Sequence, residues 1–166
     1  MTVIQGNVWK FGDNVDTDVI VPGKYLIGDL PEIAAHVMEG VRPGFADLVS
    51  TGDVIVGGKN FGTGSSREMA PRAIQAAGIA AIVAQSFARI FFRNCINVGL
   101  VPIECATTGD IAEGQRVRID TAAGEVVVVD TGATHRALGL PPEIGAILKA
   151  GGLEPLLKQQ IEGKIS

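Results

Sequence analysis

The distribution of apolar residues predicts alternating strands and helices in the middle third of the chain. Short apolar runs that end at glycine are typical of strands buried on both faces, and longer segments with one apolar face are typical of helices. The predicted strands cover residues 54–56, 79–84 and 101–103, and the predicted helices cover 71–77 and 87–97, with Ser86 as the N-cap of the second helix. This order predicts a parallel sheet with right-handed crossovers.

The segments on either side of this central unit show a different pattern. Residues 116–120 and 125–130 flank a short turn that contains glycine, which indicates an antiparallel hairpin. A further strand is predicted over 3–11, and further helices are predicted over 32–38, 142–149 and 153–160. The sequence therefore predicts an α/β fold in one domain spanning 1–166, with a mainly parallel central βαβ unit and flanking antiparallel strands.

The composition excludes several classes of protein. Hydrophobic residues make up 46% of the chain and charged residues 19%, which excludes a disordered protein. No apolar run reaches the roughly 18 residues of a membrane span, and no export signal is visible at the N-terminus. The net charge is −4 without a basic cluster, so nothing favours a nucleic-acid partner. Two cysteines, Cys95 and Cys105, cannot alone build a four-ligand metal site, and we expect a reduced, cytoplasmic protein.

The segment 57–71, with the sequence GGKNFGTGSSREMAP, is the main candidate for chemistry. It lies between a predicted strand and a predicted helix, where α/β sheets present their ligand sites. Ser65 and Ser66 supply hydroxyls beside the helix start, whose free amides favour an anion. Arg67 can hold a carboxylate through two parallel hydrogen bonds. These residue types predict a site that binds a carboxylate and removes a neighbouring proton.

A structural interpretation of the same segment stays open. Ser65 and Glu68 match the S-x-x-E capping box, so both side chains could simply close a helix turn. Pro71 would fall inside a helix that began at Ser66, so we expect a short turn and a restart at Pro71. The segment matches neither a P-loop, nor a dinucleotide fingerprint, nor a hydrolase nucleophile elbow. The two histidines, His36 and His135, are isolated and expected to be structural or exposed, and not catalytic.

A second polar segment, DNVDTD at 13–18, precedes the apolar run 19–21. Three carboxylates in six residues suggest a calcium loop, but the glycine and the final glutamate of such a loop are absent. Two interpretations remain. The segment is a solvated turn that leads into a strand, or Thr17 and Asp18 orient a partner side chain or a substrate hydroxyl.

Three long strings resemble one protein family. DNVDTDVIVPGKYL, GGKNFGTGSSREMAP and AIVAQSFARIFFRNCINVGLVPI are similar, in order and spacing, to the small subunits of 3-isopropylmalate dehydratase, the free-standing swivelling domain of the aconitase superfamily. The resemblance implies a swivelling β/β/α domain and a hydro-lyase of leucine biosynthesis that interconverts 2-isopropylmalate and 3-isopropylmalate. It also implies a large-subunit partner that carries a [4Fe–4S] cluster, while this chain binds no cofactor or metal.

The resemblance also implies roles for individual residues. Ser65 is expected to be the base, acting as an alkoxide, and Ser66 and Arg67 are expected to stabilise it and to bind a substrate carboxylate. Thr17 and Asp18 are expected to complete the wall of the site on this subunit. The substrate is expected to be a small dicarboxylate.

The segment Tyr25, Leu26, Ile27 and Gly28 resembles the loop through which this family selects its substrate. Relatives that act on homoaconitate or citrate place an arginine there, whereas Ile27 suits an isopropyl or methyl group, because an arginine facing an alkyl group would lack an ion partner. The loop does not separate 3-isopropylmalate from 2-methylmalate or 2,3-dimethylmalate. The wider segment 22–45 has mixed character and could be a lid, a specificity loop or a plain connection. A non-catalytic anion-binding or assembly module is the alternative function from another class.

Overall fold

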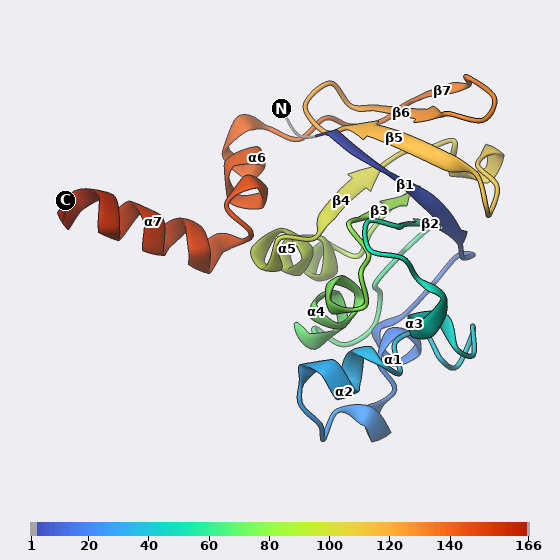
Figure 1. The fold of residues 1–166 in the computed structure, drawn as a ribbon. Coiled ribbons are helices and arrows are strands. Elements are labelled where there is room, and N and C mark those ends of the chain that lie inside the picture. The colour runs from blue at the N-terminus through green and yellow to red at the C-terminus, as the bar shows by residue number, and fades with distance from the viewer. Residues whose placement is uncertain (1–2, 166) are drawn as a thin grey trace.

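The computed structural model describes residues 3–165, whose strands form one seven-stranded sheet (Figure 1). The strands are β1 (Val3–Lys10), β2 (Val54–Gly57), β3 (Ala81–Ala84), β4 (Val101–Glu104), β5 (Arg116–Asp120), β6 (Glu125–Val128) and β7 (Thr134–Arg136). In the order β4-β3-β2-β1-β5-β6-β7, the strands from β4 to β1 pair in parallel and those from β1 to β7 pair antiparallel. The predicted fold class, a mainly parallel central unit with flanking antiparallel strands, is confirmed.

The sheet curls so that its two outer strands approach each other at one end. The backbone N–H of Leu138, just after β7, donates to the carbonyl of Glu104 at the end of β4 over 2.9 Å. Side chains from both halves therefore meet inside the curl, where Val83 packs in one buried cluster with Val117 and Val126. Apolar burial of this kind is the main favourable term in folding, and here it ties the parallel half to the antiparallel half.

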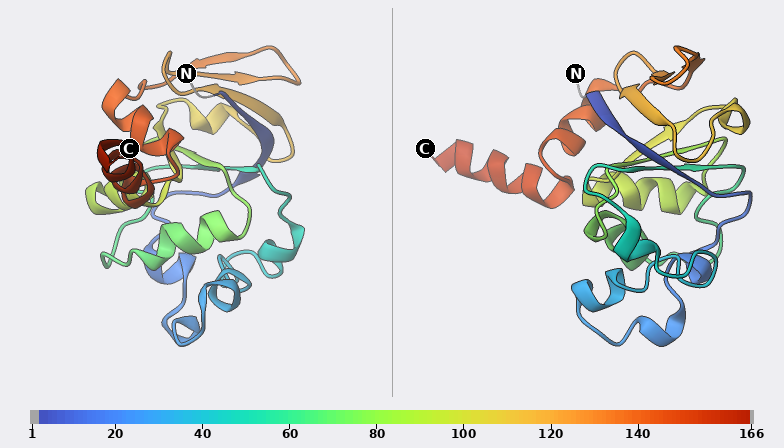
Figure 2. Two further views of the ribbon diagram at one scale, coloured as in Figure 1. Left: turned by 60° about the vertical axis from the view of Figure 1, so that its left-hand side comes forward. Right: turned by 45° about the vertical axis from the view of Figure 1, so that its right-hand side comes forward.

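Helices cover the outer face of the parallel strands (Figures 1 and 2). The described helices are α1 (Thr17–Ile20), α2 (Leu30–Ala34), α3 (Phe45–Leu48), α4 (Met69–Ala76), α5 (Arg89–Val98), α6 (Pro142–Lys149) and α7 (Leu153–Ile165), with short 3₁₀ turns at Gly23–Tyr25 and Thr108–Asp110. Of these, α4 and α5 pack directly against the parallel strands. Phe91, Cys95 and Val98 of α5 follow the helical repeat and are buried against this face. Gly99, with φ +88°, ends α5 in the left-handed conformation that glycine adopts without strain.

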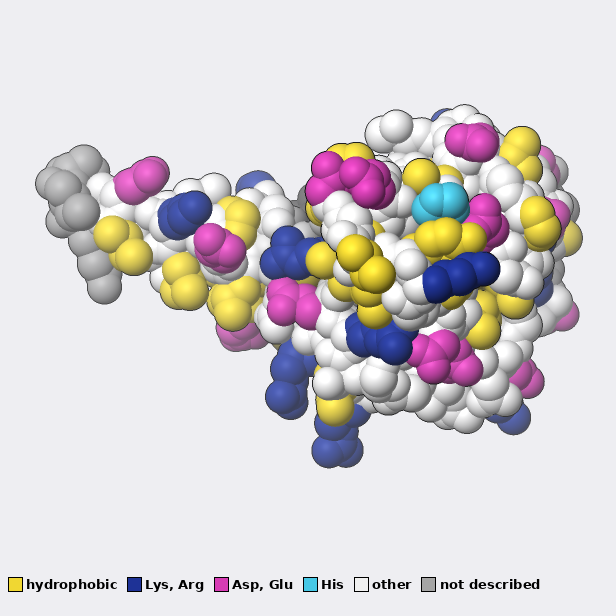
Figure 3. All heavy atoms as spheres, turned by 90° about the horizontal axis from the view of Figure 1, so that it is seen from below, with side chains coloured by type: hydrophobic (Ala, Val, Ile, Leu, Met, Phe, Trp, Pro, Cys, Tyr) yellow, Lys and Arg dark blue, Asp and Glu magenta, His cyan; other side chains and the backbone are white. Residues whose placement is uncertain are grey.

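The last helix, α7, projects away from the sheet and exposes apolar side chains along its length (Figures 1 and 3). Leu153, Leu157 and Ile161 are its exposed large apolar residues, and they recur at every fourth position. Among residues 3–165, no helix is both long and apolar enough to cross a membrane.

The N-terminal third departs from the predicted elements in two places. Residues 13–18 lead into α1 and not into a strand, because the Asp16 carboxylate accepts the N–H of Val19 over 2.8 Å and so caps a helix. The helix predicted over 32–38 ends as α2 at Ala34. Met38 adopts a positive φ of 60° and donates its N–H to the carbonyl of Ile20, which fixes the chain in a different direction.

Three further boundaries differ from the prediction. Ser86 is not the N-cap of α5, which begins at Arg89 after Ala88, because the Ser86 hydroxyl instead accepts the N–H of Asn60 over 2.8 Å. The second strand of the predicted hairpin ends at Val128, and the sequence did not predict β7, which pairs with it. The terminal helix α7 continues beyond the predicted residue 160.

Substituting Gly62 by alanine is expected to destabilise the chain strongly, because Gly62 has φ +83° and an added Cβ would lie 2.0 Å from Cγ of Phe91. Gly114→Ala is a matched control, since Gly114 has φ +87° but meets no atom within 4 Å. Backbone strain alone should cost about 1–2 kcal/mol in either variant, and the clash should add about 1–3 kcal/mol at Gly62 only. Urea unfolding of both variants measures the difference, and equal losses would contradict the expectation.

Candidate active site

The candidate site lies at the carboxyl ends of β1, β2 and β3, where the chain leaves the parallel strands. A cavity of about 220 Å³ is present there. It is lined by Thr17, Gly62, Thr63, Gly64, Ser65, Ser66, Arg67, Ala88, Arg89, Ile90, Phe91 and Asn94. Three connections that are distant in the sequence therefore meet at one edge of the sheet, as the parallel topology requires.

Backbone hydrogen bonds hold residues 61–63 of the glycine-rich loop between residues 15–17 on one side and Ser86 on the other. The N–H of Gly62 donates to the carbonyl of Val15 over 2.7 Å, and the N–H of Thr17 donates to the carbonyl of Thr63 over 2.9 Å. On the other side, the N–H of Phe61 donates to the carbonyl of Ser86 over 3.0 Å. The side-by-side pairing of these segments therefore continues past the ends of the strands. This pairing restricts the backbone of the loop near the cavity.

Aromatic packing supports the floor of the loop. Phe61 is fully buried, and its ring centroid lies 6.1 Å from that of Phe87 and 5.6 Å from that of Phe91. Gly62 follows directly and has no side chain, so the backbone can lie against the Phe91 ring. The loop is thus anchored in the core on one side and open to the cavity on the other.

Ser65 lies at the exposed rim of the cavity, two residues after Thr63, which pairs with Asp16 and Thr17. Its Oγ atom is 3.0 Å from Oγ1 of Thr17, which is only 1% exposed. The buried threonine hydroxyl and the accessible serine hydroxyl form one pair. The serine oxygen can therefore meet a ligand from the cavity while the threonine supports it from behind.

The capping-box interpretation of Ser65 and Glu68 is wrong. The helix α4 begins at Met69, and no side chain caps its N-terminus. The Glu68 carboxylate instead pairs with Arg72, one turn further along, at 3.0 Å. Pro71 occupies the third position of α4, where an N–H would have no partner inside the helix, so the helix runs through it and the expected restart does not occur.

Arg67 is fixed by two acceptors next to the cavity. Its Nη1 atom is 2.8 Å from Oδ1 of Asp18 and donates to the carbonyl of Val21 at 3.1 Å. Asp18 thus orients a guanidinium whose other nitrogen, Nη2, forms no hydrogen bond with the described part of the chain. Four of the predicted site residues, Thr17, Asp18, Ser65 and Arg67, are therefore brought into two contacting pairs, and Ser66 lines the same cavity.

The predicted substrate-selecting segment lies outside this cavity. Together with Lys24, Glu32 and His36, residues 25, 27 and 28 line a separate cavity of about 240 Å³. The Tyr25 ring stacks on His36 with 3.9 Å between ring centroids, and a hydrogen bond from Tyr25 is the largest cause that lowers the pKa of Glu39, with His36 adding to it. Ile27 is 92% exposed, so an apolar side chain faces outward here without a cover from this chain.

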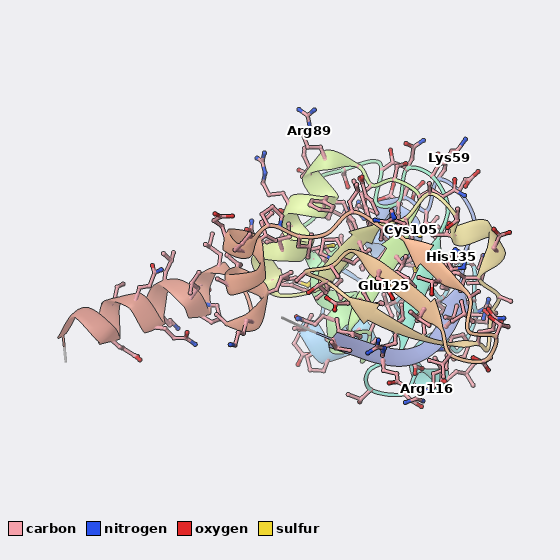
Figure 4. All side chains as sticks on the ribbon, turned by 90° about the horizontal axis from the view of Figure 1, so that it is seen from above. Lys59, Arg89, Cys105, Arg116, Glu125 and His135 are labelled. Atoms are coloured by element: carbon pink, nitrogen blue, oxygen red, sulfur yellow. The ribbon has the colours of Figure 1, made fainter. Side chains whose placement is uncertain are left out.

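Sequence reasoning assigned no role to the start of α5, although its residues line the cavity. Arg89, Ile90 and Asn94 contribute to the wall, and Arg89 projects outward from the first turn of the helix (Figure 4). The signal was present in the sequence, because this helix follows the carboxyl end of β3 just as the glycine-rich loop follows β2.

The cysteines and histidines lie away from the candidate cavity. Within residues 3–165 there is no group of three or more His, Cys, Asp or Glu side chains that could hold a metal ion. Cys95 and Cys105 are buried in two different core clusters. Cys105 contacts the Thr107 hydroxyl, which is hydrogen-bonded to Nδ1 of His135 at 2.6 Å, and the side chains of Cys105 and His135 lie close together in Figure 4. These residues do not fit an iron–sulfur cluster.

Comparison with known proteins identifies relatives along nearly the whole chain. Residues 49–108 match the family model of the aconitase C-terminal domain. A 3-isopropylmalate dehydratase small subunit 1 from Methanopyrus kandleri is 52% identical over 95% of this chain and 94% of its own length. The chain belongs to the 3-isopropylmalate dehydratase small-subunit family. A methanogen homoaconitase small subunit from Methanothermobacter thermautotrophicus is 51% identical over 91% of this chain and 88% of its own length.

The three-dimensional structure of the chain also matches this family. A crystal structure of 3-isopropylmalate dehydratase from Methanocaldococcus jannaschii superimposes with a TM-score of 0.92 and 46% sequence identity. The match covers 99% of this chain and all of that chain. The family's fold is therefore retained along the described chain, including the antiparallel strands and the terminal helices that lie outside residues 49–108.

Both thiols are expected to resist alkylation in the folded chain. Burial raises the pKa of the Cys95 thiol well above its usual value, and Cys105 is buried out of reach of the reagent. Iodoacetamide should label neither cysteine at neutral pH and both after denaturation in guanidinium chloride, as measured by mass spectrometry. Rapid labelling of the folded chain at either position would contradict this expectation.

Proposed function

We propose that this chain is the small subunit of a two-subunit hydro-lyase that interconverts 2-isopropylmalate and 3-isopropylmalate in leucine biosynthesis. The observation that carries the proposal is the Ser65 hydroxyl at the exposed rim of the cavity, with the Arg67 guanidinium fixed beside it by Asp18. Residues 1–166 act as one domain in this proposal, and they work in the cytoplasm, where free cysteines such as Cys95 and Cys105 persist as thiols.

The positions of these residues support a proton abstraction next to a carboxylate. Ser65 and Ser66 precede the N-terminus of α4, so backbone dipoles and the Arg67 cation together favour negative charge there. The Arg67 guanidinium binds one substrate carboxylate and places the adjacent carbon near Ser65 Oγ. Ser65, acting as an alkoxide, takes the proton from that carbon while the hydroxyl leaves the neighbouring carbon, which gives the alkene intermediate. Rehydration in the opposite sense, with water added to the first carbon and the proton delivered from Ser65 to its neighbour, completes the isomerisation.

The departure of the substrate hydroxyl requires groups from the partner. The described residues that line this cavity include no carboxylate and no histidine, and the neighbouring Asp18 is already paired with Arg67. We therefore place the leaving-group chemistry, with the [4Fe–4S] cluster that the family resemblance implies, on the large subunit. Closure of that subunit over the rim would also exclude water, which strengthens every charge interaction inside the site.

The exposed Ile27 supports an alkyl-substituted malate as the substrate. Its side chain suits an isopropyl group, and 2-methylmalate or 2,3-dimethylmalate offer the same apolar character in smaller form. Homoaconitate is the second candidate, because a relative with 51% identity is named for it and because Lys24 lines the same cavity as Ile27. Comparing kcat/KM for 2-isopropylmalate, 2-methylmalate and homoaconitate with the assembled enzyme decides between them. A preference for homoaconitate would overturn the isopropylmalate assignment.

Ser65→Ala is expected to abolish most of the activity of the enzyme assembled anaerobically with its large subunit. Loss of a general base lowers kcat by about 10²- to 10⁴-fold. Steady-state kinetics of isopropylmalate isomerisation measure the effect, and the affinity between the subunits, measured in parallel, should stay unchanged. A rate within a few-fold of the parent enzyme would remove Ser65 from the role of base.

Arg67→Lys is expected to raise KM for the diacid about tenfold or more, because lysine cannot make two parallel hydrogen bonds with one carboxylate. Arg72→Lys is the matched control, since Arg72 lies in α4, which follows Arg67, and pairs only with Glu68 among the described residues. Its kinetics should match those of the parent enzyme. Equal KM values for the two variants would contradict the proposed contact with substrate.

A further inference from the structure

The hydroxyls of Thr17 and Ser65 are in contact but differ in their exposure to solvent. Thr17 is 1% exposed and Ser65 is exposed, yet their oxygens are 3.0 Å apart. Within the described chain neither hydroxyl has another hydrogen bond. Because Thr17 is buried, water has little access to its hydroxyl. Among the described residues, the hydrogen-bond partner of that hydroxyl is therefore Ser65 Oγ.

The backbone fixes Thr17 independently of its side chain. Its N–H donates to the carbonyl of Thr63, and Asp16 forms an isolated parallel bridge with the same residue. Asp16 also caps α1 through the N–H of Val19. Gly64 lies directly against the hydroxyl, since a Cβ at Gly64 would be 3.3 Å from Thr17 Oγ1. The threonine oxygen is therefore held at a set position relative to the loop that carries Ser65.

We propose that Thr17 is a positioning residue for the base: its hydroxyl donates a hydrogen bond to Ser65 Oγ, orients that oxygen toward the cavity and stabilises its alkoxide form. The inference rests on the proposed function, in which Ser65 removes the substrate proton. An alkoxide oxygen can only accept hydrogen bonds, so Thr17 is the donor whenever Ser65 is charged. Thr17 therefore acts through Ser65, and not on the substrate.

The charges near the two hydroxyls are consistent with Thr17 as the donor and Ser65 as the acceptor. A hydrogen bond donated to the charged form of a group stabilises that form, and bonds to charged oxygens are shorter and stronger than neutral ones. Two carboxylates flank Thr17 along the chain, and both have partners: Asp18 is paired with Arg67 at 2.8 Å, and Asp16 accepts the N–H of Val19. The buried Thr17 hydroxyl cannot be replaced easily by bulk water, which makes its loss costly.

The test compares Thr17→Val, which keeps the shape but removes the hydroxyl, with Thr17→Ser, which keeps the hydroxyl. In the enzyme assembled with its large subunit, Thr17→Val should lower kcat by about 10- to 100-fold, as expected for a lost bond to a charged group. KM should change less than threefold, and the pH at which kcat rises should move upward. Thr17→Ser should restore kcat to within a few-fold of the parent enzyme.

Thr17→Ala provides a second variant without the hydroxyl in case valine disturbs the packing, and it should show a similar loss of kcat. Thermal unfolding and large-subunit affinity of each variant identify any structural damage. A parent-like kcat in Thr17→Val or Thr17→Ala would overturn the inference, and so would an equal loss in Thr17→Ser. Ser65→Ala, measured in parallel, separates the two proposals: if it remains active, the base assignment itself fails, whereas an inactive Ser65→Ala beside a fully active Thr17→Val removes only the role of Thr17.

Discussion

The geometry of the candidate site depends on the way the glycine-rich loop is held between two segments that follow other strands. Gly62 bonds to Val15 and Thr63 bonds to Thr17 on one side, and Phe61 bonds to Ser86 on the other. Each of these contacts is a backbone hydrogen bond, so it fixes the path of the chain and not merely one side chain. Because β1, β2 and β3 are parallel, their carboxyl ends bring these segments to the same edge of the sheet. The position of the Ser65 hydroxyl therefore depends on the order of the strands.

Two adjacent residues of the short helix α1 contact different parts of the site. Thr17 faces inward and contacts the Ser65 hydroxyl, whereas Asp18 faces outward and holds the Arg67 guanidinium. Successive positions on a helix point about 100° apart, so adjacent residues of α1 can reach different partners. The helix has only four residues, and the Asp16 carboxylate caps its start. The aspartate that starts the helix is therefore as necessary to the arrangement as the residues that touch the loop.

The sequence predicted the strands of the parallel unit well, because residues such as Ile55 and Ile82 lie in short apolar runs that only a sheet buried on both faces accommodates. It failed where a local side chain decides the conformation. Val19 and Ile20 favour a strand by composition, but the Asp16 cap makes them helical. Ser86 has the composition of an N-cap, yet a loop amide distant in the sequence occupies its hydroxyl. The strand β7 has three residues, of which only His135 is buried, so its pattern was too short to detect.

For the site, the residue types of segment 57–71 predicted anion chemistry, but spacing alone could not separate a capping box from a binding site. That decision depends on Thr17, which is 48 positions away from Ser65 and could be connected to it only by the fold or by the family resemblance. Arg67 shows the same limit. Its guanidinium bonds to Asp18 and to the carbonyl of Val21, and its Nη2 atom is 3.9 Å from the place of a Cβ on Gly23, at the start of the segment that carries Ile27. Arg67 therefore lies between the cavity with Ser65 and the cavity with Ile27. In the proposed function, a change of side chain at the exposed Ile27 leaves the contacts of Arg67 and Ser65 intact, so the same proposed base serves diacids that differ only in the group they present to that segment.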